Sequence, residues 1–346
     1  MTLRNKLLSI TACASIILLA GCGGAGSKSG KPATDPGTPN RYTNLAGGNG
    51  PILAIKIDDT APAHPQLNLD KADVIYIEQV EGGLTRIASI FSNPKTLPDE
   101  VGPVRSARIS DLDILAQYGH VGFVFSGAQT LFYPKIREAN LENISADREP
   151  PSIYSRDPLR SAPTNLIVHP KLLLTKTIDV EKRKIDLPKD SGWTFGSAPG
   201  GGKVVTSVAI KWPASRYSAT WSAVEKRWLM GYDGKPDLAA NGLPLGSPTL
   251  IIQKVVITPS IYRDREGGVT PFSQTVGSGS AYLMRDGRAI PIFWNRSSPE
   301  VATSWTLKDG TPAHFATGQI WIALTDTDPS FTYPVETPAA SPTSKK

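Results

Sequence analysis

The sequence predicts an α+β fold, in which an N-terminal layered α/β domain precedes a mostly antiparallel β domain. Strand-like apolar runs alternate with amphipathic helical runs over residues 51–185, which is typical of layered α/β domains. Short β-rich runs separated by tight turns then fill residues 203–333. With 346 residues, the chain is long enough for both domains.

The first domain should contain both strands and helices. Strands are expected where apolar runs end at turn residues, at 52–57, 72–80, 85–91 and 120–125. Ser110 is expected to cap a helix whose last apolar position is Ala116, and Gly119 would stop that helix. Short helices are also expected at 130–139 and 171–174.

The second domain should consist mainly of short strands. They are expected at 203–212, 218–221, 226–232, 250–258, 280–284, 289–294 and 319–324. Asp-Gly pairs that end at Gly234, Gly287 and Gly310 are typical of tight hairpins. All seven tryptophans, from Trp193 to Trp321, fall in or just before this half. We interpret them as core and cross-strand packing residues, with a sugar-binding face as the alternative.

The N-terminus predicts a bacterial lipoprotein signal over residues 1–21. Arg4 and Lys6 precede the apolar run 7–19, which is too short for a transmembrane helix. The run ends in Leu19-Ala20-Gly21-Cys22, a lipobox pattern in which the cysteine receives lipid such as palmitate and becomes the new N-terminus. We therefore expect a protein anchored through Cys22 on the extracytoplasmic face of the cell membrane. The alternative is an ordinary secretory signal with an incidental cysteine.

Three segments are predicted to lie outside the two domains. Residues 22–50 are rich in Gly, Ser, Pro, Thr and Asn, and they predict a flexible tether. Residues 186–202 are expected to form a linker, and residues 334–346 a disordered tail.

Composition excludes several classes of function. Loss of Cys13 and lipidation of Cys22 leave no free thiol, which excludes disulfides and cysteine-based metal sites. Removal of Arg4 and Lys6 takes the basic residues from 37 to 35 against 31 acidic ones, a net charge of +4. Because this excess is mild and lacks a basic block, nucleic-acid binding is not expected.

Two segments of the first domain bring arginines close to turns. Arg86 follows the Gly82-Gly83 turn, while Arg105 and Arg108 follow a Gly-Pro pair just before the expected helix. Guanidinium groups and the free N–H groups of a helix N-terminus both favour phosphate or carboxylate. The sequence therefore predicts an anion-binding site made by Arg86, Arg105, Arg108, Ser106, Arg156 and Asn165.

Each of these residues also has an ordinary structural role as its alternative. Glu78 should fall nearly opposite Arg86 across the turn, and the two could form an ion pair. Arg108 could pair with Asp111 one helical turn away. The polar loop that holds Arg156 and Asn165 could equally be tied down by their hydrogen bonds.

Carboxylates at strand ends and turns supply the candidates for catalysis. Asp58, Asp59 and Glu81 could hold a divalent metal or act as a base, but residues at such positions more commonly cap helices and turns. Asp58 and Glu81 are the two speculative catalytic residues. The scattered histidines form no HExxH motif, and no Gly-x-Ser-x-Gly elbow occurs. No cofactor or metal site is therefore expected, except for a divalent metal if the protein is an enzyme.

Several motifs resemble a known family. Residues 72–76, 80–86, 101–108 and 156–166 of this chain are similar to the YerB-type lipoproteins, bacterial envelope proteins built from two adjacent domains of unknown function. The resemblance is weaker in the second domain, where residues 277–294 and 318–322 carry it. The family often has His where Thr164 stands, so no role of that histidine is transferred. A looser analogy, in residue order only, runs to the LytR-CpsA-Psr phosphotransferases.

The resemblance implies a cell-envelope location but no settled activity. Combined with the arginines, it predicts a membrane-anchored lipoprotein that binds an anionic envelope ligand or a wall-synthesis partner. The first alternative is a phosphotransferase or hydrolase that acts on cell-wall glycopolymer precursors, with Arg86, Arg105 and Arg108 on phosphate. A purely structural scaffold for wall-synthesis enzymes is the second.

Overall fold

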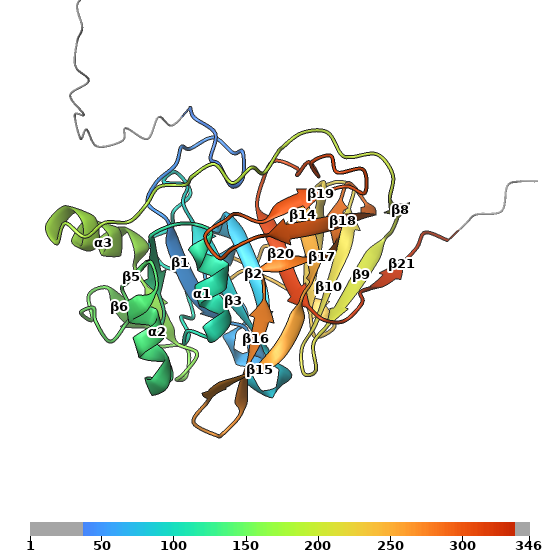
Figure 1. The fold of residues 1–346 in the computed structure, drawn as a ribbon. Helices are drawn as coiled ribbons and strands as arrows, with labels where there is room; N and C mark the ends of the chain where they lie inside the picture. The colour runs from blue at the N-terminus through green and yellow to red at the C-terminus, as the bar shows by residue number, and fades with distance from the viewer. Residues whose placement is uncertain (1–36, 336–346) are drawn as a thin grey trace, which may run out of the picture. The chain divides into compact units, whose positions relative to one another are not determined.

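A long mixed β-sheet runs through both predicted domains of the chain. The computed structural model describes residues 37–335. Within them the largest sheet has 11 strands, in the order β19-β18-β17-β14-β20-β2-β3-β1-β4-β5, with β8 beside β18 (Figure 1). The signal peptide, Cys22, most of the expected tether and the tail beyond residue 335 lie outside the described residues.

Strands from distant parts of the sequence alternate in this sheet. The first region supplies β1 (Leu53–Asp58), β2 (Val74–Gln79), β3 (Thr85–Phe91), β4 (Val121–Val124) and β5 (Leu141–Asn143). The second region supplies β8 (Lys203–Val204), β14 (Thr249–Lys254), β17 (Gly277–Arg285), β18 (Arg288–Arg296), β19 (Ser304–Thr306) and β20 (Ile320–Thr325). The two regions meet where β2 pairs in parallel with β20, at Val74 opposite Ile320.

The central strands bury both faces, as strands in a covered sheet do. Leu53 and Ile55 of β1 join one hydrophobic core, whereas Ala54 joins the other. The first core also holds Val208 and Trp228 of a second sheet. That sheet contains β9 (Ser207–Lys211), β10 (Arg216–Ser222), β11 (Arg227–Tyr232), β12 (Lys235–Pro236), β13 (Gly246–Ser247) and β21 (Ser330–Thr332).

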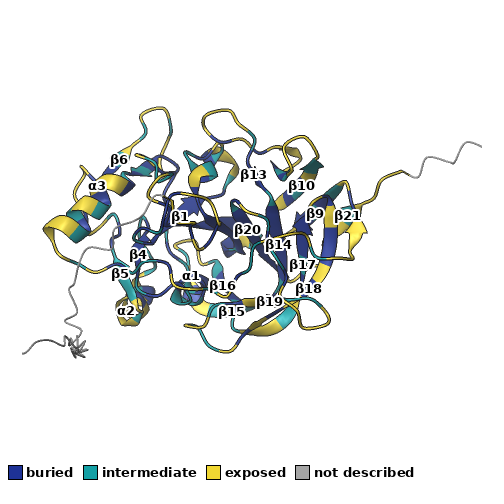
Figure 2. Cartoon of the chain, turned by 90° about the horizontal axis from the view of Figure 1, so that it is seen from above, coloured by how far each residue is buried: buried dark blue, intermediate teal, exposed yellow. Residues whose placement is uncertain are grey.

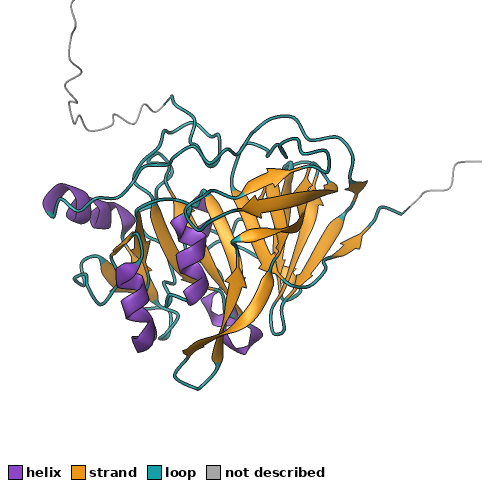
Figure 3. Ribbon diagram, viewed as in Figure 1, coloured by secondary structure: helices purple, strands orange, loops and turns teal. Residues whose placement is uncertain are grey.

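Helices cover the other face of the first region (Figure 3). Ile114 and Leu115 of one helix and Ile136 of another join the second core. These helices are α1 (Ile109–Ala116) and α2 (Tyr133–Glu138). A third helix, α3 (Pro170–Leu174), packs on the first core through Leu173 and continues into the π-helical η5 (Thr175–Val180). Single 3₁₀ turns are η1 (Ala61–Ala63), η2 (Leu69–Lys71), η3 (Glu81–Gly83) and η4 (Thr130–Phe132).

Two short antiparallel pairs complete the described part of the chain. They are β6 (Tyr154–Arg156) with β7 (Leu166–Val168), and β15 (Val256–Arg263) with β16 (Val269–Gln274). The predicted α+β class is confirmed, with a mixed sheet and helices in the first region and antiparallel pairing dominating the second.

Three expectations need correction. The helix at 109–116 begins two residues earlier than predicted, so Arg108, and not Ser110, is its N-cap residue. The strand expected at 250–258 is two strands, because buried Val255 ends β14 and the chain leaves the large sheet as β15. Residues 37–50, expected as tether, pack onto the fold, where Tyr42 is buried. The central strands β1, β14 and β20 are also buried (Figure 2).

The tryptophans are packing residues, as interpreted from the sequence. Six of the seven are buried, and Trp221 is half-buried against Trp228 with ring centroids 5.3 Å apart. Trp212 donates its indole N–H to the Leu324 carbonyl at 2.8 Å, and Trp294 donates to the Lys254 carbonyl at 3.0 Å. The alternative of an open sugar-binding face made by these rings is therefore wrong.

Candidate functional site

The turn between β2 and β3 positions the first half of the site. Gly82 and Gly83 adopt φ of +68° and +73°, which favour glycine, and they reverse the chain within η3. The strands then pair in the register that the sequence predicts, with Glu78 opposite Arg86. Arg86 is therefore the second residue of β3 and lies close to the turn that holds Glu81.

The segment before α1 positions the second half. The Arg105 N–H donates to the Lys56 carbonyl at 2.8 Å, and the Ser126 N–H donates to the Arg105 carbonyl at 2.9 Å. These two hydrogen bonds hold the segment between β1 and β4, near the carboxyl ends of both strands. The Arg108 N–H then donates to the Asp111 carboxylate at 2.6 Å, which fixes the start of the helix.

Arg86 is buried without a carboxylate partner. Its side chain is 6% exposed, and its Nη1 donates to the Ser106 carbonyl at 3.1 Å. Its Nε has no hydrogen-bond partner, and none of the ion pairs among residues 37–335 includes it. Burial lowers the pKa of Arg86 below its ordinary value, and the nearby Arg108 lowers it further.

Glu78, the predicted partner of Arg86, is held by another residue. Lys56 contacts both Glu78 and Asp111 inside the core, the latter at 2.7 Å, and all three side chains are inaccessible to solvent. Burial lowers the pKa of Lys56 to about 8, against the opposing effect of Asp111. The ion pairs proposed as structural alternatives, Arg86 with Glu78 and Arg108 with Asp111, are both wrong.

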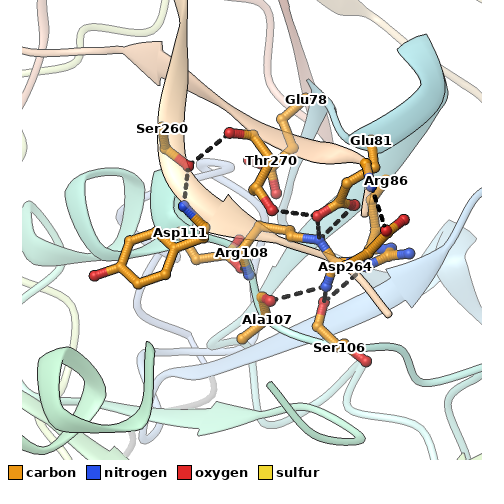
Figure 4. A network of polar contacts seen from close by, with 12 residues as sticks. Glu78, Glu81, Arg86, Ser106, Ala107, Arg108, Asp111, Ser260, Asp264 and Thr270 are labelled. Carbon is orange, nitrogen blue, oxygen red and sulfur yellow. Dashed lines mark hydrogen bonds and ion pairs between the residues drawn. The ribbon is translucent and has the colours of Figure 1, made fainter. Parts of the chain in front are cut away.

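The two arginines that precede α1, Arg105 and Arg108, are ion-paired. Arg108 contacts Glu81 at 2.7 Å, and Glu81 also accepts a hydrogen bond from Thr270 on β16 (Figure 4). Burial opposes ionisation of Glu81, but Arg108 outweighs it and lowers the pKa of this carboxyl. Arg105 contacts buried Asp58 at 2.6 Å and keeps 24% of its own side chain exposed.

These side chains line one cavity of about 1480 Å³. Its wall contains Glu81 and Ser106, together with aromatic rings such as Tyr133 and Tyr262. We term it the arginine cavity, since the described part of the chain contributes six arginines to it: Arg86, Arg105, Arg108, Arg156, Arg263 and Arg265.

The predicted anion-binding residues are thus brought together with one exception. Arg156 lines the arginine cavity and donates from Nη1 to the Asn165 side chain at 2.7 Å. Asn165 itself does not line it, and therefore positions Arg156 from behind. Thr164 donates to the Ser161 carbonyl at 3.0 Å within the same loop.

The candidate catalytic carboxylates differ in position. Glu81 lines the arginine cavity, whereas Asp58 lies behind Arg105 and is inaccessible to solvent. Asp59 belongs to a separate buried cluster, where it accepts hydrogen bonds from Thr85 and Tyr217, each at 2.5 Å. No group of three or more His, Cys, Asp or Glu among residues 37–335 is arranged to hold a metal.

Arg263 and Arg265 were missed by sequence reasoning. The stretch from Arg265 to Gly268 has the local pattern of a plain turn and repeats the Glu-Gly-Gly of residues 81–83. It is the tip of the β15–β16 hairpin, and both arginines line the arginine cavity. Two arginines beside a Gly-Gly pair were the available signal, but hairpin placement across the chain is not visible in a local pattern.

Comparisons with known proteins cover both regions of the chain. Residues 38–185 match the model of the N-terminal domain of a protein of unknown function (DUF3048), and residues 208–322 match the model of its C-terminal domain. The chain belongs to the DUF3048 family. The arginine cavity of this DUF3048 protein draws Arg86 from the first domain and Arg263 from the second, so both domains form it.

Similar proteins support the resemblance to YerB-type lipoproteins. "Putative lipoprotein YerB" from Bacillus subtilis (strain 168) is 41% identical over 56 residues, and the chain spans about a sixth of the length of this curated relative. The crystal structure of the YerB protein from Bacillus subtilis shares the fold, with a TM-score of 0.70 at 18% identity. That match covers 84% of this chain and 98% of the other. The predicted family is confirmed.

Membrane attachment is not tested by the fold. No helix among residues 37–335 combines the length and apolar character needed to cross a bilayer. The Cys22 anchor lies outside the described residues and stays a prediction.

Proposed function

We propose that this DUF3048 protein is a membrane-anchored lipoprotein that binds an anionic ligand of the cell envelope in the arginine cavity. One observation carries the proposal: Arg86 is buried in the cavity wall and lacks a carboxylate partner. A buried charge without a counter-ion costs several kcal/mol of stability. A phosphate or carboxylate bound beside Arg86 would supply the missing counter-charge, and it would bind strongly because the guanidinium is already desolvated.

The surrounding groups favour an anion at this position. Arg105 keeps part of its side chain exposed at the cavity, and Ser106 adds a hydroxyl to the wall. Arg108 stands at the first turn of α1, where the helix dipole also attracts negative charge. Positive groups from a strand, a loop and a helix start thus surround one space, which is the arrangement that anion sites use.

Binding is favoured over the alternative of phosphotransfer or hydrolysis. A general base needs a carboxylate that is free to take a proton from substrate. Asp58 is fully buried in its contact with Arg105, and Glu81 is held by Arg108 and Thr270. Both candidate carboxylates therefore hold arginines in place and are not free to act as a base. The enzyme alternative rests on no other group of the described residues.

The membrane anchor is proposed on two grounds. The lipobox of this chain ends at Cys22, and a relative from Bacillus subtilis carries the name of a lipoprotein. We expect Cys22→Ser to release the protein from membranes, whereas the unaltered chain stays in the membrane fraction and incorporates labelled palmitate. Labelling of the variant equal to that of the unaltered chain would contradict the anchor.

The anion site is tested with inorganic phosphate by calorimetric titration. The soluble chain from residue 37 onward contains the whole arginine cavity and is the form to use. We expect Arg86→Met to weaken phosphate binding by about tenfold or more, which is the loss of one charged hydrogen bond. Arg216→Met is the matched control, because Arg216 is exposed and lies outside the cavity. Equal affinity of both variants would rule out Arg86 as the anion-binding group.

A further inference from the structure

The β15–β16 hairpin of the second domain closes one side of the arginine cavity. Thr270 of β16 donates to Glu81, and the Ser273 N–H donates to the Ser110 hydroxyl at 3.0 Å. Tyr262 of β15 packs edge-on against Phe132, with ring centroids 5.2 Å apart. The hairpin is therefore fixed to the first domain along both of its strands (Figure 1). Its tip, with Arg263 and Arg265, lines the cavity.

The tip presents two arginines that make no ion pair within the described residues. Arg263 and Arg265 are both exposed, and both line the arginine cavity. Arg263 donates from Nη1 to the Gly267 carbonyl at 3.0 Å, which leaves its other nitrogens available. Among residues 37–335, no hydrogen bond or ion pair holds the Arg265 side chain, so its guanidinium can reach a ligand.

The acidic residues of the tip, Asp264 and Glu266, also line the arginine cavity, but neither forms an ion pair with an arginine of the tip among residues 37–335. Asp264 is turned back on the loop, where its Oδ1 accepts the N–H of Gly268 at 2.7 Å and of Glu266 at 3.0 Å. Glu266 is exposed and its side chain has no hydrogen bond or ion pair within the described residues, so it can turn away from an arriving anion. Gly267, at φ +88°, allows the tight loop that brings Arg263 and Arg265 onto the same tip.

The size of the cavity also exceeds what one small anion needs. Its volume of about 1480 Å³ is larger than the roughly 300–1,000 Å³ of ordinary small-molecule sites. A single phosphate beside Arg86 would fill only part of this volume. A longer ligand could place separate negative groups against both walls.

We propose that Arg263 and Arg265 form a second cationic subsite, so that the arginine cavity takes an anion with at least two separated phosphate or carboxylate groups. This inference rests on the proposed anion-binding function. One negative group lies against Arg86 and Arg105 in the first domain, and another lies against the hairpin tip in the second. The hairpin thereby selects chain-like polyanions over single anions.

The experiment compares two probes, inorganic orthophosphate and a linear polyphosphate long enough to span the cavity, at one fixed ionic strength. We expect Arg263→Ala/Arg265→Ala to lower polyphosphate affinity by about tenfold or more and orthophosphate affinity by less than about twofold. The matched control is Arg137→Ala/Arg216→Ala, which removes the same charge from exposed positions outside the cavity. It should change neither affinity by more than about twofold.

The outcomes separate this inference from the function on which it rests. If the hairpin double variant matches the control with polyphosphate, or weakens both probes equally, the second subsite is overturned. If the unaltered protein binds neither probe, the proposed anion-binding function fails first. Arg263→Gln/Arg265→Gln, with its thermal unfolding compared to that of the unaltered protein, guards against a loss that comes from misfolding of the tip.

Discussion

Arg86 shows how a single residue can trade stability for binding. It is fully charged at neutral pH by ordinary chemistry, yet it lies in the wall of the arginine cavity with one carbonyl as its hydrogen-bond partner. Arg108 has the opposite surroundings, because Glu81 neutralises it at 2.7 Å. Two arginines of the same cavity should therefore respond differently to the same substitution.

We expect Arg86→Met to unfold at the same or a higher urea concentration than the unaltered protein, because an unpaired buried charge is replaced by an apolar chain of similar length. Arg108→Met should instead lose about 1–3 kcal/mol of unfolding free energy, since it leaves the Glu81 carboxylate buried and unpaired. Urea unfolding of both variants in phosphate-free buffer checks this. A larger loss for Arg86→Met than for Arg108→Met would show that Arg86 is a structural residue.

At the residue scale, the sequence predicted which arginines gather but not what holds them. Arg86, Arg105 and Arg108 lie close to turns that local patterns reveal, and they do line one cavity. Which residues pair with them depends on the tertiary structure. Lys56, in the middle of β1, forms ion pairs with both Glu78 and Asp111. A buried lysine inside a strand gives no local signal, so the two predicted ion pairs were wrong.

The next scale is the element, and the turn η3 is the one that fixes the site. Gly83 lies against the loop between β9 and β10, where its carbonyl accepts the Ala214 N–H at 2.8 Å. A Cβ on Gly83 would stand 2.5 Å from the Pro213 side chain, whereas a Cβ on Gly82 would meet nothing within 4 Å. Because both glycines have positive φ, alanine causes backbone strain at either position. The two substitutions therefore differ only in the contact with Pro213.

We expect Gly82→Ala to cost about 1 kcal/mol of unfolding free energy, the usual strain of a positive φ. Gly83→Ala should cost more and should also weaken phosphate binding, because the turn must shift away from Pro213 and take Glu81 with it. Chemical unfolding and phosphate titration of the two variants measure both effects. Equal stability and affinity would mean that the contact with Pro213 does not position the turn.

Elements were predictable where their pattern is local. The strand at 85–91 was predicted with the bounds that β3 has, and the helix expected between Ser110 and Gly119 is α1, which ends at Ala116. The break between β14 and β15 was not predicted, since residues 250–258 form an uninterrupted β-rich run. The chain leaves the large sheet there because β15 pairs with β16 instead, and that choice depends on partners far along the sequence.

At the scale of the whole molecule, the two family domains are joined through shared structure. The parallel pairing of β2 with β20 makes one sheet from both, and each hydrophobic core contains residues of both. This pairing joins residues that are far apart in sequence, so no local pattern could predict it. The arginine cavity is formed by both domains and therefore depends on the pairing of β2 with β20.

His64 supplies a polar contact between the same regions. Its Nδ1 lies 2.8 Å from Asp237 of the second region, and its Nε2 lies 3.3 Å from Asp59 of the first. The ring also stacks on Tyr232, with centroids 4.1 Å apart. Burial disfavours the charged ring, but the hydrogen bonds with Asp237 and Asp59 outweigh it and raise the pKa of His64 to about 10.

The charge on His64 should make the union of the two regions depend on pH. Because the folded pKa is about 10 and the unfolded value about 6.5, the folded state holds the extra proton between these limits. The contribution of His64 is complete below pH 6.5 and is lost as pH rises towards 10, at up to about 1.4 kcal/mol per pH unit. We expect His64→Gln to remove this slope, so that the two proteins differ most in urea midpoint at pH 6 and least near pH 10. Parallel midpoints across that range would mean that His64 is neutral in the folded protein, and that the regions are joined by packing and strand pairing without this ion pair.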